Sequence, residues 1–160
     1  MKVFLLTLSL LLNTLLVEGQ ESKFKALFIY KFIDYIEWPS GSSEVVIGVV
    51  GSTDVLDELK NFTASKSGIT VKEVKSGGDL GSAKVLYIPN LSGSSAREIV
   101  SIVGEKPILI ITDQRETVGN TSDIGFFLSD GKLRFVISKS KIEKKNMLPS
   151  SKLLSLGETI

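Results

Sequence analysis

The stretch from Phe24 to Pro39, FKALFIYKFIDYIEWP, is the most distinctive part of this sequence. Its apolar residues recur with helical spacing, while Lys31, Asp34 and Glu37 step by three and form one polar stripe. The pattern predicts a helix from Glu21 to Trp38, because Pro39 disfavours helical backbone at the residue before it. A helix with so wide an apolar surface has to be buried against a core or a partner.

Beyond this helix, short apolar strands alternate with helical segments. A capping box, Ser95 with Glu98, predicts the start of the second of these helices. The alternation predicts an α/β fold with a mixed, largely parallel sheet flanked by helices. Strands are predicted at Val45–Val50, Ile69–Val74, Val85–Ile88 and Ile108–Ile111, and helices are predicted to end near Phe62 and Val103.

The C-terminal part predicts a β-hairpin and two short helices. Asp-Gly is typical of a tight hairpin turn because it accepts positive φ angles. Ser140 with Glu143 predicts a second capping box, and Pro149 fits the first turn of the last helix. The hairpin is predicted to consist of Ile124–Leu128, the turn Ser129-Asp130-Gly131, and Leu133–Ile137.

The first residues predict export. Lys2 precedes an apolar run from Val3 to Val17, shorter than the roughly 20 residues that a membrane-spanning helix needs. Gly19 is small enough to precede a cleavage site. We therefore expect a signal peptide over residues 1–19 and a single domain over residues 20–160; a retained membrane anchor is the alternative.

The composition argues against an enzyme. The 160 residues contain no His and no Cys, which removes Ser-His and Cys-His nucleophile pairs and the commonest transition-metal ligands. We therefore expect no cofactor and no metal site, although hydrolases built on two carboxylates stay formally open. A net charge of +1 gives no reason to expect a nucleic-acid partner.

One candidate ligand-binding residue lies at the end of a predicted strand. Asp113 follows Ile108–Ile111 in the sequence, at the carboxyl edge where α/β folds place functional groups. Within the polar loop Thr112–Asp123, it could accept a ligand or pair with Arg115. The alternative is an aspartate that only forms a turn at a strand end.

Basic and aromatic residues suggest an interaction surface. The basic residues could meet an acidic receptor surface or anionic lipid headgroups, or form an ordinary solvated face. Tyr30 and Trp38 could anchor an interface or pack in the core. The basic cluster consists of Lys132, Arg134, Lys139, Lys141, Lys144, Lys145 and Lys152, with only Glu143 opposing.

Both ends of the sequence resemble the YfiR family, the YfiR/HmsC-like regulators. The head of that family reads roughly Phe-x-Tyr-x-Phe, followed after four residues by Glu-Trp-Pro. The hairpin and the segment Leu148–Leu156 resemble its C-terminal signature. The residues that match the head are Phe28, Tyr30, Phe32, Glu37, Trp38 and Pro39.

The resemblance implies a periplasmic regulator that represses an inner-membrane diguanylate cyclase by binding its periplasmic part. Cyclic di-GMP and biofilm formation would rise when repression is lifted. Some members carry cysteines linked to redox control, and their absence here excludes that role. The residues expected to contact the partner are Tyr30, Trp38, Arg134, Phe135, Leu148, Ser151, Lys152 and Leu154.

A second hypothesis is a periplasmic module that senses a small molecule or peptide. Such a module would be coupled to a sensor kinase or to an uptake system. Its support in the sequence is the loop Thr112–Asp123, with Asp113 and Arg115 as ligand-binding residues. A homodimer and contact with the membrane surface also stay open at this point.

Overall fold

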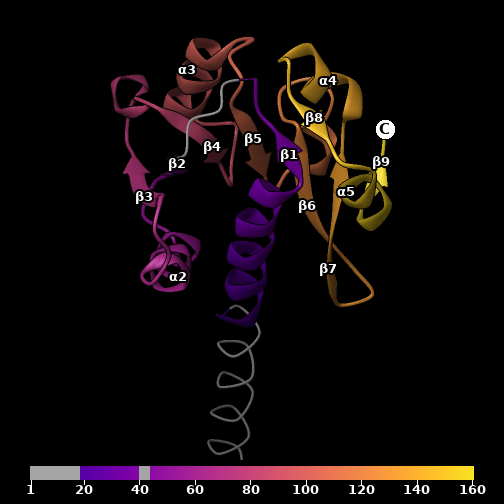
Figure 1. Cartoon of the computed structure of the whole chain (residues 1–160), viewed down its shortest axis with the longest axis horizontal. Coiled ribbons are helices and arrows are strands. Elements are labelled where there is room, and N and C mark those ends of the chain that lie inside the picture. Colours follow the sequence, from indigo (N-terminus) through magenta and orange to yellow (C-terminus); the bar gives the residue numbers. More distant parts are fainter. Residues whose placement is uncertain (1–18, 40–43) are drawn as a thin grey trace, which may run out of the picture.

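The computed structural model describes residues 19–39 and 44–160 (Figure 1). The predicted signal peptide, apart from Gly19, lies outside the described residues. Residues 19–34 are helical and are called the N-terminal helix below. This helix ends before Trp38, contrary to the sequence prediction, because Ile36 and Glu37 leave it to form the short strand β1 (Ile36–Glu37).

A mixed sheet forms the centre of the described structure, with the strand order β3-β2-β4-β5-β6-β7-β9. Neighbouring strands from β3 to β6 pair in parallel, β6 and β7 form an antiparallel hairpin, and β9 joins β7 in parallel. The predicted fold class is therefore confirmed. The strands are β2 (Val45–Val50), β3 (Ile69–Val74), β4 (Ala83–Tyr87), β5 (Leu109–Thr112), β6 (Ile124–Ser129), β7 (Lys132–Ile137) and β9 (Glu158–Thr159).

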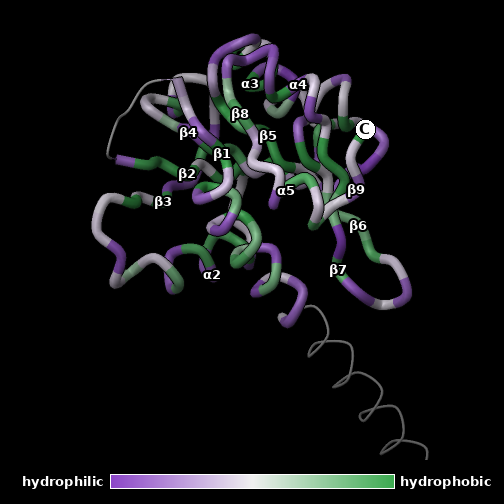
Figure 2. The backbone as a smooth tube through the Cα atoms, turned by 45° about the vertical axis from the view of Figure 1, so that its right-hand side comes forward, coloured by the Kyte–Doolittle hydropathy of each residue, from purple (hydrophilic) through white to green (hydrophobic). Residues whose placement is uncertain are grey.

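Helices cover both faces of the sheet, so the central strands are apolar on both sides. In β4, for example, Val85 and Tyr87 join the larger core, whereas Leu86 joins the smaller core. The N-terminal helix, α2 (Asp54–Thr63), α4 (Lys139–Lys144) and α5 (Ser151–Leu156) contribute to the larger core. Helix α3 (Ser94–Val103) covers the opposite face, and Figure 2 shows apolar segments concentrated along the strands between these layers.

A second, two-stranded sheet joins the segment after the N-terminal helix to the segment before α5. Strand β1 pairs antiparallel with β8 (Leu148–Pro149), with Ile36 opposite Pro149 and Glu37 opposite Leu148. Pro149 therefore lies in this strand and not in the first turn of the last helix, as the sequence had predicted. The N-cap of α5 is Ser150, whose side chain accepts a hydrogen bond from the backbone N–H of Leu153.

Local turn chemistry was predicted correctly for the hairpin but not for two helix starts. Asp130 and Gly131 have φ angles of 52° and 70°, as a tight two-residue turn requires. Helices α3 and α4 have Gly93 and Ser138 at their N-caps, and neither cap makes a side-chain hydrogen bond. Both predicted capping boxes are therefore wrong, because each N-cap lies two residues before the serine predicted to be the cap.

Candidate functional site

Four residues of the consecutive elements β8 and α5 are called the C-terminal surface below: Leu148, Ser151, Lys152 and Leu154. Leu148 is 55% exposed although it is apolar. Ser151 and Lys152 are exposed, whereas Leu154 is half-buried and packs against the larger core. Four of the predicted partner-contact residues thus lie on two consecutive elements, and three of them are exposed.

Contacts with the N-terminal motif hold the C-terminal surface in place. The backbone N–H of Ser150 donates to the carbonyl oxygen of Tyr35 at 2.9 Å. The Lys152 Nζ lies 5.3 Å from the centre of the Tyr35 ring, within the range of a cation–π contact. Together with the β1–β8 pairing, these contacts fix α5 against the end of the N-terminal helix.

The two predicted aromatic anchors occupy different places. Trp38 is half-buried against the larger core, and its Nε1 is buried without a hydrogen-bond partner among the described residues. The Lys84 Nζ lies 5.9 Å from its ring centre. Tyr30 packs on Phe62 of α2 with ring centres 5.1 Å apart, so it faces α2 and not the C-terminal surface.

Phe135 is a core residue and not a surface contact. It is 2% exposed, and its ring lies 5.0 Å from the ring of Phe32 and 5.7 Å from that of Phe28, both at steep angles. Its neighbour Arg134 points to the other face of β7 and is exposed, because successive side chains of a strand alternate. The contact surface proposed below therefore omits Phe135.

The basic cluster predicted from the sequence does not form one solvated patch. Lys145 is 3% exposed and donates to Asp123 at 2.6 Å and to the carbonyl oxygen of Ile108 at 2.9 Å. Lys139 pairs with Glu143, and Lys141 donates to a backbone carbonyl. The remaining members, Lys132, Arg134, Lys144 and Lys152, are exposed and make no ion pair with the residues that the structure describes.

The Asp123–Lys145 pair was missed by sequence reasoning. Both side chains are almost completely buried, and burial raises the pKa of Asp123 and lowers the pKa of Lys145 while their mutual attraction opposes both shifts. Asp123 also accepts from the backbone N–H of Ile110 at 2.7 Å. In the sequence the two residues belong to a polar loop and a lysine-rich run, and no local pattern connects them.

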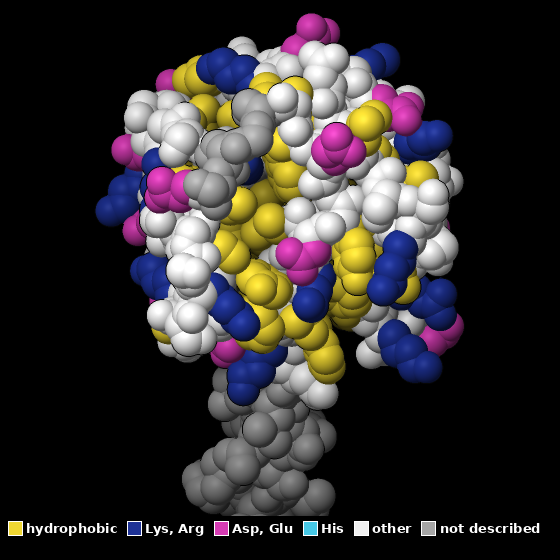
Figure 3. Space-filling model, in the orientation of Figure 1, with side chains coloured by type: hydrophobic (Ala, Val, Ile, Leu, Met, Phe, Trp, Pro, Cys, Tyr) yellow, Lys and Arg dark blue, Asp and Glu magenta, His cyan; other side chains and the backbone are white. Residues whose placement is uncertain are grey.

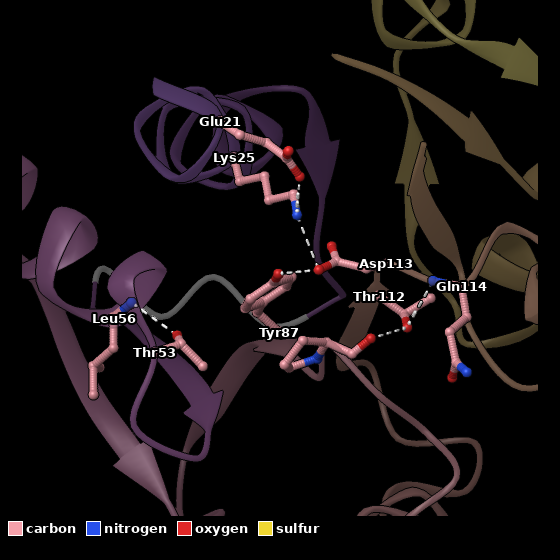
Figure 4. Close-up of polar contacts among 9 residues, drawn as sticks. Glu21, Lys25, Thr53, Leu56, Tyr87, Thr112, Asp113 and Gln114 are labelled. Carbon is pink, nitrogen blue, oxygen red and sulfur yellow. Dashed lines mark hydrogen bonds and ion pairs between the residues drawn. The ribbon is translucent and has the colours of Figure 1, made fainter. Parts of the chain in front are cut away.

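Asp113 lies at the carboxyl edge of the sheet, as predicted, and is held by neighbouring side chains (Figure 4). It accepts hydrogen bonds from the Tyr87 hydroxyl at 2.8 Å and from the Lys25 Nζ at 3.0 Å, and Lys25 also pairs with Glu21 at 2.6 Å. Burial, followed by the nearby Asp113 charge, raises the pKa of Tyr87. Burial alone would lower the pKa of Lys25, but its bonds to Glu21 and Asp113 outweigh that effect and raise it.

Arg115 does not take part in this network. Its guanidinium pairs with Glu158 of β9 and stacks 4.1 Å from the centre of the Phe127 ring. The expected alternative that Asp113 pairs with Arg115 is therefore wrong, because Lys25 of the N-terminal helix provides the cation at Asp113. The two residues proposed for ligand binding are separated into different contacts.

The chain is thus a small α/β domain, and its C-terminal surface combines the exposed apolar side chain of Leu148 with the polar side chains of Ser151 and Lys152. The family model described as YfiR/HmsC-like matches residues 22–158. The chain therefore belongs to the YfiR/HmsC-like family, which consists of regulatory, non-catalytic periplasmic proteins connected with diguanylate cyclases and cyclic di-GMP signalling. A comparison with curated proteins gave no match. Among the residues described here, no helix is both long and apolar enough to cross a bilayer.

Proposed function

We propose that this protein binds the periplasmic part of an inner-membrane diguanylate cyclase and holds the enzyme inactive by direct contact. The consequence is less cyclic di-GMP in the cytoplasm and restrained biofilm formation. In this proposal the N-terminal segment is a signal peptide, and residues 20–160 act as one exported domain that performs no chemistry of its own. Membership of the YfiR/HmsC-like family supports the regulatory role.

One observation favours the C-terminal surface as the contact. The two segments that resemble the family most closely lie at opposite ends of the chain, yet β1 and β8 pair directly. This pairing places Glu37, an exposed residue of the N-terminal family motif, directly opposite Leu148, so that motif adjoins the C-terminal surface. Leu148, exposed on β8, is the apolar centre of this surface, and Lys152 and Ser151 provide polar contacts at its rim.

The rigidity of this surface suits a repressor. The backbone bond from Ser150 to Tyr35 and the strand pairing fix the position of Leu148 before any partner arrives. A preorganised surface loses little side-chain and loop freedom on binding, so more of the contact energy contributes to affinity. Trp38, which follows β1 directly, extends the surface toward β4, where Lys84 lies over its ring.

The proposal is tested by capture of membrane proteins with matched variants. Tagged wild-type protein and the variants Leu148→Asp, Arg134→Glu and Leu128→Asp are incubated with detergent-solubilised inner membranes, and bound proteins are identified by mass spectrometry. Leu128 is 57% exposed, close to the 55% of Leu148, but lies on the hairpin, so it is a matched control. We expect wild type and Leu128→Asp to capture a diguanylate cyclase, and Leu148→Asp to lose it.

Other outcomes would change the account. Capture of a sensor kinase in place of a cyclase would favour the sensor hypothesis. Equal capture by wild type and Leu148→Asp would remove the C-terminal surface from consideration. Loss of capture in Arg134→Glu alone would move the contact to the exposed face of the hairpin, where Arg134 lies.

A further inference from the structure

A groove of about 480 Å³ lies between the first turns of the N-terminal helix and the hairpin. Its lining includes the apolar residues Phe24, Phe28, Leu128 and Leu133. Phe24 and Leu128 are large apolar side chains that are 45% and 57% exposed at its edges. Figure 3 shows apolar side chains exposed along the lower part of the molecule, next to the N-terminal helix.

The floor of the groove is continuous with the aromatic core. Phe28 lines the groove and also packs against Phe32, Phe126 and Phe135, with ring centres 5.7–6.2 Å apart. These ring contacts hold Phe28 in place at the floor of the groove. A preformed, mostly apolar hollow of this volume lies within the range of small-molecule sites, about 300–1,000 Å³.

Of the two charged side chains that line the groove, Glu21 is paired with a described residue and Lys132 is not. Glu21 lines the groove, but its carboxylate is paired with Lys25 at 2.6 Å. Lys132 lines the opposite wall and makes no ion pair with the described residues. The unpaired charge at the rim is therefore positive, and it favours a ligand with an anionic group at one end.

We propose that this groove binds a free fatty acid, with its alkyl chain against Phe24, Phe28 and Leu128 and its carboxylate at Lys132. The proposal is independent of the contact between the C-terminal surface and a cyclase. It gives the protein a second site, at which free fatty acids in the cell envelope could be sensed.

The size and chemistry of the groove favour this ligand over two others. A stable protein interface uses about 20–30 residues on each side, whereas eight residues line the groove. The phosphodiester of a phospholipid is recognised best by the two-pronged donor geometry of arginine. The groove lining has one lysine and no arginine, which suits the single charge of a carboxylate.

Calorimetric titration with dodecanoate, below its micelle concentration, tests the proposal. The protein is produced from the full sequence and purified from a periplasmic extract. We expect saturable one-to-one binding with a Kd on the order of 1 mM, because a 14-carbon acyl chain partitions with about 100 µM and each of the two missing CH₂ groups weakens binding about 4-fold. Dodecyltrimethylammonium, which has the same chain and the opposite charge, should bind at least about 3-fold more weakly, a difference that one exposed ion pair can supply.

Two variants and two controls separate the roles of the groove residues. Leu128→Ser should weaken dodecanoate binding about 5-fold or more, because it removes an apolar wall. Lys132→Gln should reduce the preference for the anion over the cation. Leu156→Ser, at a position 57% exposed as Leu128 is, and Lys144→Gln both lie outside the groove and should bind as wild type does.

Three results would overturn the proposal. They are the absence of saturable binding by the wild type up to about 10 mM dodecanoate, unchanged binding in Leu128→Ser, and an anion preference in Lys132→Gln that equals that of the wild type. If Leu128→Asp instead loses capture of a membrane protein while dodecanoate does not bind, the groove accepts a protein segment and the fatty-acid proposal is wrong.

Discussion

The backbone N–H of Ser150 donates to the carbonyl oxygen of Tyr35 at 2.9 Å, joining residues more than a hundred positions apart in the sequence. This bond lies next to the β1–β8 pairing and directly precedes α5. The helix that opens the described chain is thereby connected to the helix that carries Lys152 and Leu154. The C-terminal surface depends on both ends of the chain being folded together.

A disulfide across β1 and β8 tests this arrangement. Glu37 and Leu148 are directly opposite in the antiparallel register, where Cα atoms lie about 4.5–5.5 Å apart, within reach of a disulfide. The chain has no cysteine of its own. The double variant Glu37→Cys/Leu148→Cys should form the bond in air and gain about 2–4 kcal/mol in the free energy of unfolding, measured by urea titration with and without reductant. The control variant Glu37→Cys/Leu128→Cys places its cysteines on β1 and on the hairpin, which do not pair with each other, and it should stay reduced.

The buried Asp123–Lys145 pair should be costly to break. Replacing Lys145 by Met leaves the Asp123 carboxylate buried without its cation, and we expect a loss of about 3–5 kcal/mol in unfolding free energy. The double variant Asp123→Asn/Lys145→Met should recover much of that loss, since no charge is then left unpaired. Chemical denaturation measures all three proteins, with exposed Lys144→Met as the control, expected within about 0.5 kcal/mol of wild type. A double variant no more stable than Lys145→Met would contradict this account of the pair.

Tyr87 should make the protein less stable in alkali. Its pKa in the folded state is raised by burial and by the Asp113 charge, so it keeps its proton while the unfolded chain loses it near pH 10. The unfolded state then binds fewer protons than the folded state, and stability falls as pH rises above about 10. Between pH 9 and 11.5, the unfolding free energy of Tyr87→Phe should therefore fall less steeply than that of the wild type, by up to about 1.4 kcal/mol per pH unit. Parallel slopes would mean that Tyr87 ionises in the folded protein.

A side chain at Gly157 should destabilise the fold, because it would collide with the ring of Phe135. A Cβ at Gly157 would lie 2.2–2.9 Å from three ring atoms of Phe135, and that ring is held by the aromatic core. Gly157→Ala should therefore cost about 1–3 kcal/mol of unfolding free energy through overpacking. Gly78→Ala is the control, because its nearest neighbour would be the Ser76 Oγ at 3.7 Å, and thermal unfolding should barely distinguish it from wild type. Equal stability of Gly157→Ala and Gly78→Ala would show that the Phe135 ring can move.

Local sequence signals predicted the sheet and the hairpin but not the contacts between distant segments. The Asp130-Gly131 turn and the apolar strands are set by neighbouring residues, and their alternation with helices favours a parallel sheet. Strands β1 and β8 are only two residues long, too short to show a period, and each exists through its pairing with the other. The Lys25–Asp113 and Lys145–Asp123 pairs likewise depend on tertiary packing.

The candidate site was predicted only in part, because some of its residues are placed by local pattern and others by contacts between distant segments. Leu148 and Lys152 were predicted to contact a partner, and both are exposed on short C-terminal elements, β8 and α5. Phe135 was misplaced although the information was present, since a residue next to exposed Arg134 in a strand has to face the other side of the sheet. The groove beside Phe24 could not be predicted, because its walls come from a helix and a hairpin that meet only in the folded chain.

The most direct test of the central claim is the synthesis of cyclic di-GMP from GTP by inner-membrane vesicles that contain the captured cyclase. Purified protein is added to the periplasmic side in increasing amounts. We predict that synthesis falls to a low plateau with wild type and with Leu128→Asp, and stays at its starting rate with Leu148→Asp. A rate that is unchanged by wild-type protein, at concentrations where the cyclase is bound, would contradict repression by direct contact.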